Sequence, residues 1–144
     1  MFYQIDELLK EDRYDIYNNQ NISNEDIEQI ARVFCADRNV DYTKYFDLIK
    51  CSSKFCWINF LRIIEKLPYE EKIMGMPLLF LLLQDDNWPT YEKTMELLQS
   101  FNKEFITPYV KKYLCQAYEE KDEMWIDNIM LLAEKLEIDC LLFR

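Results

Sequence analysis

The stretch KFCWINFLRIIEKL, residues 54–67, decides the fold class. Its apolar side chains recur every three or four positions, a spacing that places them along one stripe of an α-helix. The stripe is formed by Trp57, Phe60, Leu61, Ile64 and Leu67. We therefore expect a helix over residues 54–67 that buries one face.

Similar patterns continue toward the C-terminus. Gly75 and Pro77 separate a short helix from a longer apolar one that reaches about Gln84, because proline lacks the amide hydrogen that a helix interior needs. The run 78–83 is apolar all round and should be buried. Three further helices are expected: one from Pro89, one from Pro108 to about Tyr118 with Thr107 as its N-cap, and one over residues 124–136.

The first part of the chain carries a weaker signal. Residues 24–38 read as a helix that begins behind Ser23, and residues 17–24 read as a polar loop. Shorter helices are expected over residues 3–10 and 42–50. We expect one domain over residues 1–144, made of an N-terminal helical region, 1–53, and a helical-repeat core, 54–144.

Three of the helices end in similar sequences, which suggests a repeat. IIEKL ends at Leu67, LLQSF at Phe101 and LAEKL at Leu136, so the intervals are 34 and 35 residues. Each interval has room for two helices, the size of a helix-turn-helix unit in an α-solenoid. Glycine occurs once, which argues against folds that spend glycine on tight turns and ligand loops. The predicted fold is all-α, with antiparallel helix pairs stacked as a short solenoid.

The turn QDDNWP, residues 84–89, has a structural and a functional interpretation. Trp88 precedes a proline, which disfavours helical dihedrals, while Asp86 and Asn87 can accept backbone amides at the start of the next helix. In the structural interpretation, Trp88 covers the seam between units and its indole nitrogen bonds a nearby carbonyl or carboxylate. In the functional one, the turn binds a partner through Gln84, Asp85, Asp86, Asn87, Trp88 and Tyr91.

Residues 77–136 resemble a family of short bacterial proteins with HEAT-like helical repeats, classed only as a domain of unknown function. The resemblance is carried by Gln84-Asp85, Asn87-Trp88-Pro89 and the stretch Asp122-Glu123-Met124-Trp125. The family often has an apolar residue in place of Asp86 and a second aromatic where this chain has Asn128. The resemblance implies a HEAT-like fold and no established activity. It adds Asp122 and Trp125 to the candidate binding residues.

The sequence lacks the residues that most catalytic mechanisms require. Histidine is absent, which removes Ser-His and Cys-His mechanisms and the usual catalytic zinc sites. Gly75 alone cannot form a phosphate-binding loop. Cys51 and Cys56 are the only close cysteine pair, too few for a structural zinc site. We expect no catalytic residue, no metal site and no cofactor.

The five cysteines form an odd set, and the N-terminus has acids where a signal peptide needs a basic start. We therefore expect a cytoplasmic protein with reduced thiols. The longest apolar run, residues 76–83, is far shorter than the roughly 20 residues that span a bilayer. No membrane contact is expected.

The net charge of −10 lies mainly at the two ends of the chain. Because Lys and Arg supply most affinity for phosphates, a nucleic-acid partner is not expected, whereas a basic protein partner is compatible. The first hypothesis is a non-enzymatic protein-interaction module, in its concrete form an immunity-type inhibitor of a bacterial toxin. The alternative is a small metal-dependent hydrolase that uses the acid clusters near Asp85 and Asp122.

Overall fold

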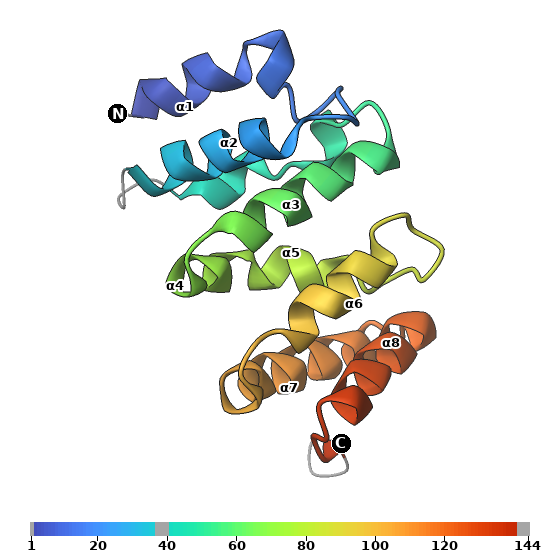
Figure 1. The fold of residues 1–144 in the computed structure, drawn as a ribbon. Coiled ribbons are helices and arrows are strands. Elements are labelled where there is room, and N and C mark those ends of the chain that lie inside the picture. The colour runs from blue at the N-terminus through green and yellow to red at the C-terminus, as the bar shows by residue number, and fades with distance from the viewer. Residues whose placement is uncertain (1, 37–40, 141–144) are drawn as a thin grey trace. The chain divides into compact units, whose positions relative to one another are not determined.

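The computed structural model describes residues 2–36 and 41–140, and within them every regular element is helical (Figure 1). The predicted all-α class is therefore confirmed. The chain forms two compact units, Met1–Gly75 and Met76–Arg144, which we call the first and the second unit. None of the helices in the described residues is long and apolar enough to cross a membrane. The predicted division into residues 1–53 and 54–144 remains a prediction.

The first unit combines α-helices with short 3-10 helices. In chain order these are α1 (Phe2–Leu9), η1 (Asp12–Tyr14), α2 (Asn24–Ala36), η2 (Tyr42–Tyr45), η3 (Leu48–Lys50), η4 (Lys54–Trp57), α3 (Ile58–Lys66), α4 (Tyr69–Lys72) and η5 (Ile73–Gly75). Helix α2 packs against α1 and α3. It begins as predicted, because the Ser23 hydroxyl accepts the Asp26 amide at 3.1 Å.

Two predicted helices of this unit take a different form. The helix expected over 42–50 is two 3-10 turns, because Asp41 and Asp47 each accept the backbone amide two residues further on, at 3.0 Å. Such side-chain bonds offer the backbone an alternative to the α-helical ladder. The helix expected from Lys54 is α-helical only from Ile58, after the 3-10 turn η4.

Aromatic rings fill the core of the first unit. Phe34 on α2 stacks on Tyr42 and Tyr45 with ring centroids 5.7 Å apart, and Phe46 stacks on Phe60 of α3 at 5.1 Å. All five side chains are buried. This cluster joins the irregular segment 42–46 to the regular helices, because offset stacked rings gain energy beyond their buried area.

The only glycine of the chain is explained by packing. A Cβ at Gly75 would lie 2.9 Å from Cδ1 of Ile64, closer than side chains approach each other. Ile64 is completely buried, so it has little room to move. Gly75 therefore allows the η5 turn to lie against α3.

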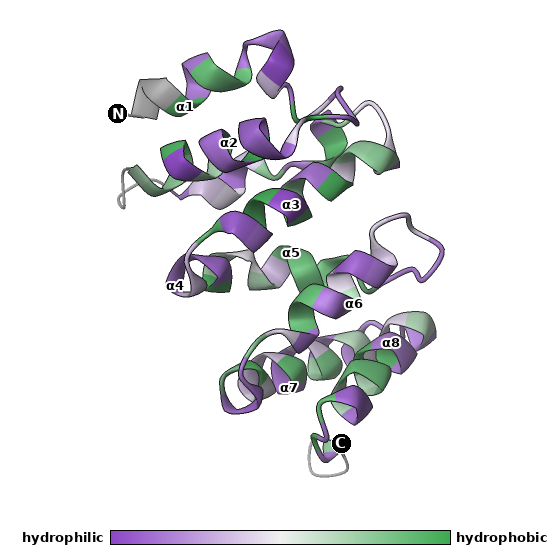
Figure 2. Ribbon diagram, viewed as in Figure 1, coloured by the Kyte–Doolittle hydropathy of each residue, from purple (hydrophilic) through white to green (hydrophobic). Residues whose placement is uncertain are grey.

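The second unit is more regular. Its helices are α5 (Met76–Leu81), α6 (Tyr91–Gln99), α7 (Lys103–Glu119) and α8 (Glu123–Lys135). Helix α8 packs against α6 and α7. Figure 2 shows α5 as apolar along most of its length. Burial of the whole run 78–83 is nevertheless a wrong prediction, because Leu81 is 37% exposed.

The predicted start of α7 is also wrong. The helix begins at Lys103, where the Asn102 side chain accepts the Glu104 amide at 2.9 Å, and Pro108 lies inside the helix. The Thr107 hydroxyl donates to the Lys103 carbonyl at 2.6 Å, so it acts within the helix and caps nothing. An Asn N-cap five residues earlier gives a better start signal than the Thr-Pro pair. The helix extends through the proline to Glu119, one residue beyond the predicted end.

Candidate functional site

The QDDNWP turn connects α5 to α6 in the second unit. The Asp85 carboxylate accepts the Asn87 amide at 2.8 Å, and the Asp85 carbonyl accepts the Trp88 amide at 3.2 Å. Gln84, Asp85 and Trp88 are half-buried, while Asp86 and Asn87 are exposed. These local bonds are those of an Asx turn, in which an aspartate side chain replaces a backbone acceptor.

The start of α6 differs from the prediction. The helix begins at Tyr91 and not at Pro89, and its N-cap Thr90 makes no side-chain capping bond. The acid that binds a turn amide is Asp85, whereas Asp86 and Asn87 were expected to cap the helix. The structural reason is that residues 88–90 still belong to the turn, so the two residues lie too far from the first helical amides.

The second predicted motif lies at the start of α8. Asp122 is the N-cap of this helix, and its carboxylate accepts the Trp125 amide at 3.1 Å. The Trp125 side chain is buried, and its indole nitrogen donates to the Phe80 carbonyl at the end of α5 at 2.8 Å. Tyr113 of α7 stacks on Phe80, with ring centroids 4.7 Å apart, and also contacts Trp125. The binding candidate Trp125 is thus an interior residue.

Asn128 is a residue whose role the sequence did not reveal. Its side-chain nitrogen donates to the Leu83 carbonyl at 2.7 Å, and its oxygen accepts the Tyr91 hydroxyl at 3.3 Å. It lies one helical turn after Trp125, on the same buried face of α8. An asparagine within an apolar helical stripe is the signal that could have revealed it, because a buried amide needs partners.

The structure thereby places α8 against the segments on either side of the QDDNWP turn. Trp125 and Asn128 bind the carbonyls of Phe80 and Leu83, which lead into the QDDNWP turn, and Tyr91 follows that turn. Burial raises the pKa of the Tyr91 hydroxyl, and the charge of Asp86 adds to the effect. The arrangement holds the end of α5 against α8. It favours the structural interpretation of these residues over a ligand site.

A different surface of α8 is open to solvent. We use the term α8 face for the residues at positions 126, 127, 130, 131 and 134, which lie along one side of the helix. Leu131 on this face is 40% exposed, and Ile126 and Met130 are half-buried. Two hollows of about 630 and 490 Å³ adjoin the face and share Asp127. Apolar side chains and acids therefore alternate along an uncovered helix surface.

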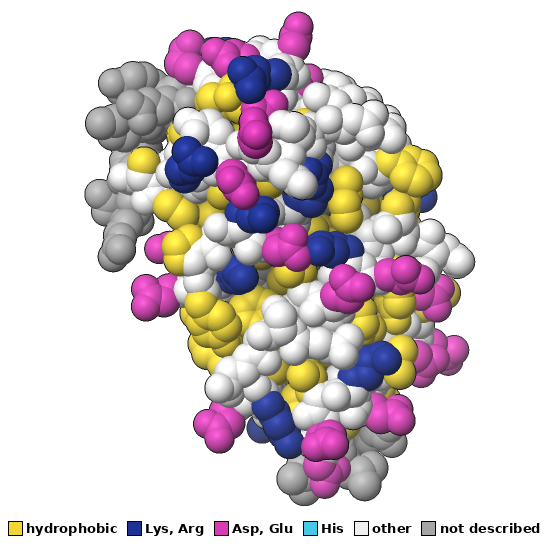
Figure 3. Space-filling view, viewed as in Figure 1, with side chains coloured by type: hydrophobic (Ala, Val, Ile, Leu, Met, Phe, Trp, Pro, Cys, Tyr) yellow, Lys and Arg dark blue, Asp and Glu magenta, His cyan; other side chains and the backbone are white. Residues whose placement is uncertain are grey.

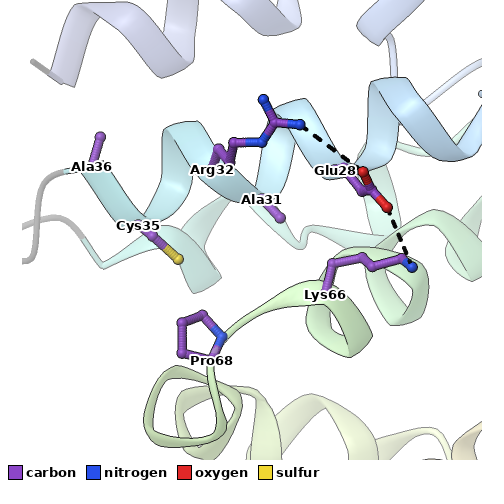
Figure 4. Close-up of a pocket in the computed structure, with 7 residues that line it drawn as sticks. All are labelled: Glu28, Ala31, Arg32, Cys35, Ala36, Lys66 and Pro68. Carbon is purple, nitrogen blue, oxygen red and sulfur yellow. Dashed lines mark ion pairs between the residues drawn. The ribbon is translucent and has the colours of Figure 1, made fainter.

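The first unit has a groove beside the C-terminal half of α2 (Figure 4). This α2 groove has a volume of about 450 Å³ and is lined by Glu28, Ala31, Arg32, Cys35, Ala36, Lys66 and Pro68. Figure 4 shows Arg32 and Lys66 pointing toward Glu28 from either side, with the Cys35 sulfur facing Pro68. The groove can hold a small ligand that carries a negative charge.

The described residues contain no group of three or more Cys, Asp or Glu side chains that could hold a metal ion. The described residues thus form an all-helical protein in which Trp125 of the second motif makes an interior contact between α8 and α5. The chain belongs to the family described as Domain of unknown function (DUF5071), whose model matches residues 54–139. The match begins where the sequence places the start of the repeat core. Neither a curated protein nor a solved structure matches the chain.

Proposed function

We propose that the chain is a non-enzymatic protein-interaction module that binds a basic protein partner through the α8 face. The observation that carries this proposal is the combination of exposed apolar side chains and dense negative charge on one helix. On the α8 face, Leu131 is 40% exposed, and Ile126 and Met130 are half-buried. Single exposed apolar residues are ordinary, but several along one helix side, next to hollows, form a surface that a partner can cover.

Charge selects the kind of partner. Residues 119–139 contain eight acidic and two basic side chains, a net charge of −6 out of −10 for the whole chain. Figure 3 shows acidic side chains gathered where α6 and α8 face the viewer. A field of one sign speeds the approach of an oppositely charged protein and repels a second copy of the same surface. A basic partner is therefore favoured over self-association through this face.

The apolar residues of the α8 face would act as anchors. Interfaces gain most of their energy from a few apolar or aromatic side chains at the centre, surrounded by a polar rim. On the α8 face, Met130 and Leu131 are the candidate anchors, and the acids Asp127 and Glu134 flank them along the helix surface. In its concrete form the proposal is an immunity-type inhibitor of a basic bacterial toxin, on a stack of HEAT-like helix pairs.

The hydrolase alternative has no specific observation in its favour. Asp85 is engaged with a turn amide and Asp122 with the first turn of α8. Carboxylates with such backbone partners serve turn and cap geometry. We therefore retain the interaction module as the single proposed function.

The proposal is tested by comparing what the wild-type chain and two charge-reversal variants retain from lysate of the source cell. Asp127→Lys should weaken retention of a basic protein by about tenfold or more, because like charges across an interface cost several kcal/mol. Glu96→Lys is the matched control, since Glu96 is an exposed acid on α6 outside the α8 face. Equal retention by both variants, or retention of acidic proteins only, would refute the proposal.

A further inference from the structure

The α2 groove in the first unit exists because small side chains of α2 face the turn at Pro68. Positions 28, 31, 32, 35 and 36 lie along one side of α2. Three of them are alanine or cysteine, and Ala31 is buried at the base of the groove. Larger apolar residues at these positions would fill the space against Pro68. The groove therefore has an apolar base at Ala31 and charged side chains along its edge.

The charges around this floor are unbalanced. Two cations, Arg32 and Lys66, share one carboxylate, Glu28, at 4.0 and 3.6 Å. Charge-assisted hydrogen bonds are about 2.7–2.9 Å long, so both contacts are ion pairs that leave donors available. The side chains of Arg32 and Lys66 are 70% and 41% exposed, and Arg32 makes one further bond, to Gln29. The groove therefore has capacity for a second anionic group.

We propose that the α2 groove binds an amphiphilic carboxylate, a carboxylate group joined to a short apolar body. The carboxylate lies between Arg32 and Lys66, and the apolar body covers Ala31. Glu28 already lies between the two cations, which shows that their spacing suits a group of this size and charge (Figure 4). A volume of about 450 Å³ is within the range of small-molecule sites. This site is independent of the α8 face.

One consequence separates this proposal from a purely structural role of the ion pairs. Glu28 shares the two cations with the ligand, so its negative charge weakens their attraction for the ligand carboxylate. Removing its charge in Glu28→Gln should therefore tighten ligand binding, by up to about fivefold, the upper range for an exposed ion pair. If the three residues only joined α2 to α3, the same substitution would leave ligand binding unchanged.

The experiment titrates octanoate into the full chain and follows backbone amide shifts by NMR. We expect the shifts to centre on Ala31 and Cys35, with Arg32→Gln and Lys66→Gln each weakening binding by up to about fivefold. Arg62→Gln is the matched control, because Arg62 lies on the same helix as Lys66 but bonds Asn24. All these side chains lie at the surface and their loss should leave the fold intact.

Two sources can supply the ligand, a free acid or the C-terminus of a polypeptide that ends in apolar residues. The relative affinities of octanoate and acetyl-dileucine distinguish the two sources. Each acid is also compared with its own uncharged amide. Tighter binding of either acid than of its amide supports the proposal, whichever of the two acids binds more tightly. Equal binding of acid and amide would overturn it. Unchanged affinity in Glu28→Gln, or shifts confined to the second unit, would also overturn it.

Discussion

Each of the two units contains an irregular segment that side chains of a regular helix hold in place. In the first unit, Asn59 of α3 donates to the carbonyls of Ile16 and Asn19, at 3.0 and 2.8 Å. In the second, Trp125 and Asn128 of α8 donate to carbonyls at the end of α5. Ile16, Asn19 and Leu83 lie outside α-helices, and a buried carbonyl without a donor would cost free energy. The Phe80 carbonyl, in the last turn of α5, also accepts the Leu83 amide at 3.1 Å.

The two arrangements differ in how completely the polar groups are paired. The Asn59 side-chain oxygen is buried without a hydrogen-bond partner, whereas the Asn128 oxygen accepts the Tyr91 hydroxyl. A buried polar atom without a partner costs roughly 1–3 kcal/mol. The Asn128 side chain in the second unit thus has both polar ends paired, whereas the Asn59 side chain leaves its oxygen unpaired while it holds the loop around residues 16–19. The second unit has one buried unpaired atom of its own, the Thr90 hydroxyl, which lies outside this pair of contacts. Four predictions test the contacts within the two units, and the third tests this difference directly.

The largest effect is expected at Trp125. Trp125→Ala removes a buried ring and the bond to Phe80, and should lower the free energy of unfolding by about 3–5 kcal/mol. Urea denaturation followed by circular dichroism measures the change. Trp125→Phe keeps a ring but loses the N–H donor, and should cost about 1–3 kcal/mol. An unchanged urea midpoint in Trp125→Ala would show that α8 does not hold α5.

Two neighbouring leucines of α8, one exposed and one buried, give the next test. Leu132 is completely buried, so Leu132→Ala should cost about 2–5 kcal/mol. Leu131 is 40% exposed, and Leu131→Ala should change the free energy of unfolding by less than about 0.5 kcal/mol. Thermal melts of the two variants provide the measurement. Similar losses in both would mean that the α8 face is covered and cannot be a free contact surface.

The two asparagines are compared directly by Asn59→Ala and Asn128→Ala. Each leaves buried carbonyl oxygens without donors and should cost about 1–3 kcal/mol. The loss should be smaller for Asn59, because its unpaired oxygen is removed together with its two hydrogen bonds. Urea midpoints of both variants decide the order. A larger loss for Asn128→Ala supports the contrast between the units, and the reverse order contradicts it.

The smallest change in stability near neutral pH is expected from groups of the first unit that ionise only at high pH. Burial raises the pKa of Tyr17, Tyr45 and the Cys51 thiol to about 12. Between about pH 9 and 12 the unfolded chain therefore loses these protons before the folded chain does, so the folded state loses stability as pH rises. Urea midpoints at pH 8 and 10.5 measure this loss. Tyr17→Phe should reduce it, and an identical pH dependence in this variant would refute the assignment to Tyr17.

The regular helices could be predicted from the sequence, and the contacts that place the motifs could not. Apolar periodicity indicated α8 within one residue of its start and end, and Ser23 correctly marked the start of α2. The same reasoning missed the 3-10 turns at 42–50, where local aspartate bonds compete with the α-helix. The family resemblance made Trp125 a binding candidate although its side chain is buried, because sequence does not show whether a tryptophan near a turn faces inward.

The sequence by itself determined the helical class, the places where most helices lie and the acidity of residues 119–139, because periodicity and charge are properties of the chain. Only the tertiary structure decided that Asn128 binds Leu83, that Lys66 joins the local Arg32–Glu28 pair, and which side of α8 is open. The first two features join residues 45 and 38 positions apart, and the third depends on what covers a helix. Burial and pairing arise only when distant segments pack, so no local pattern encodes them.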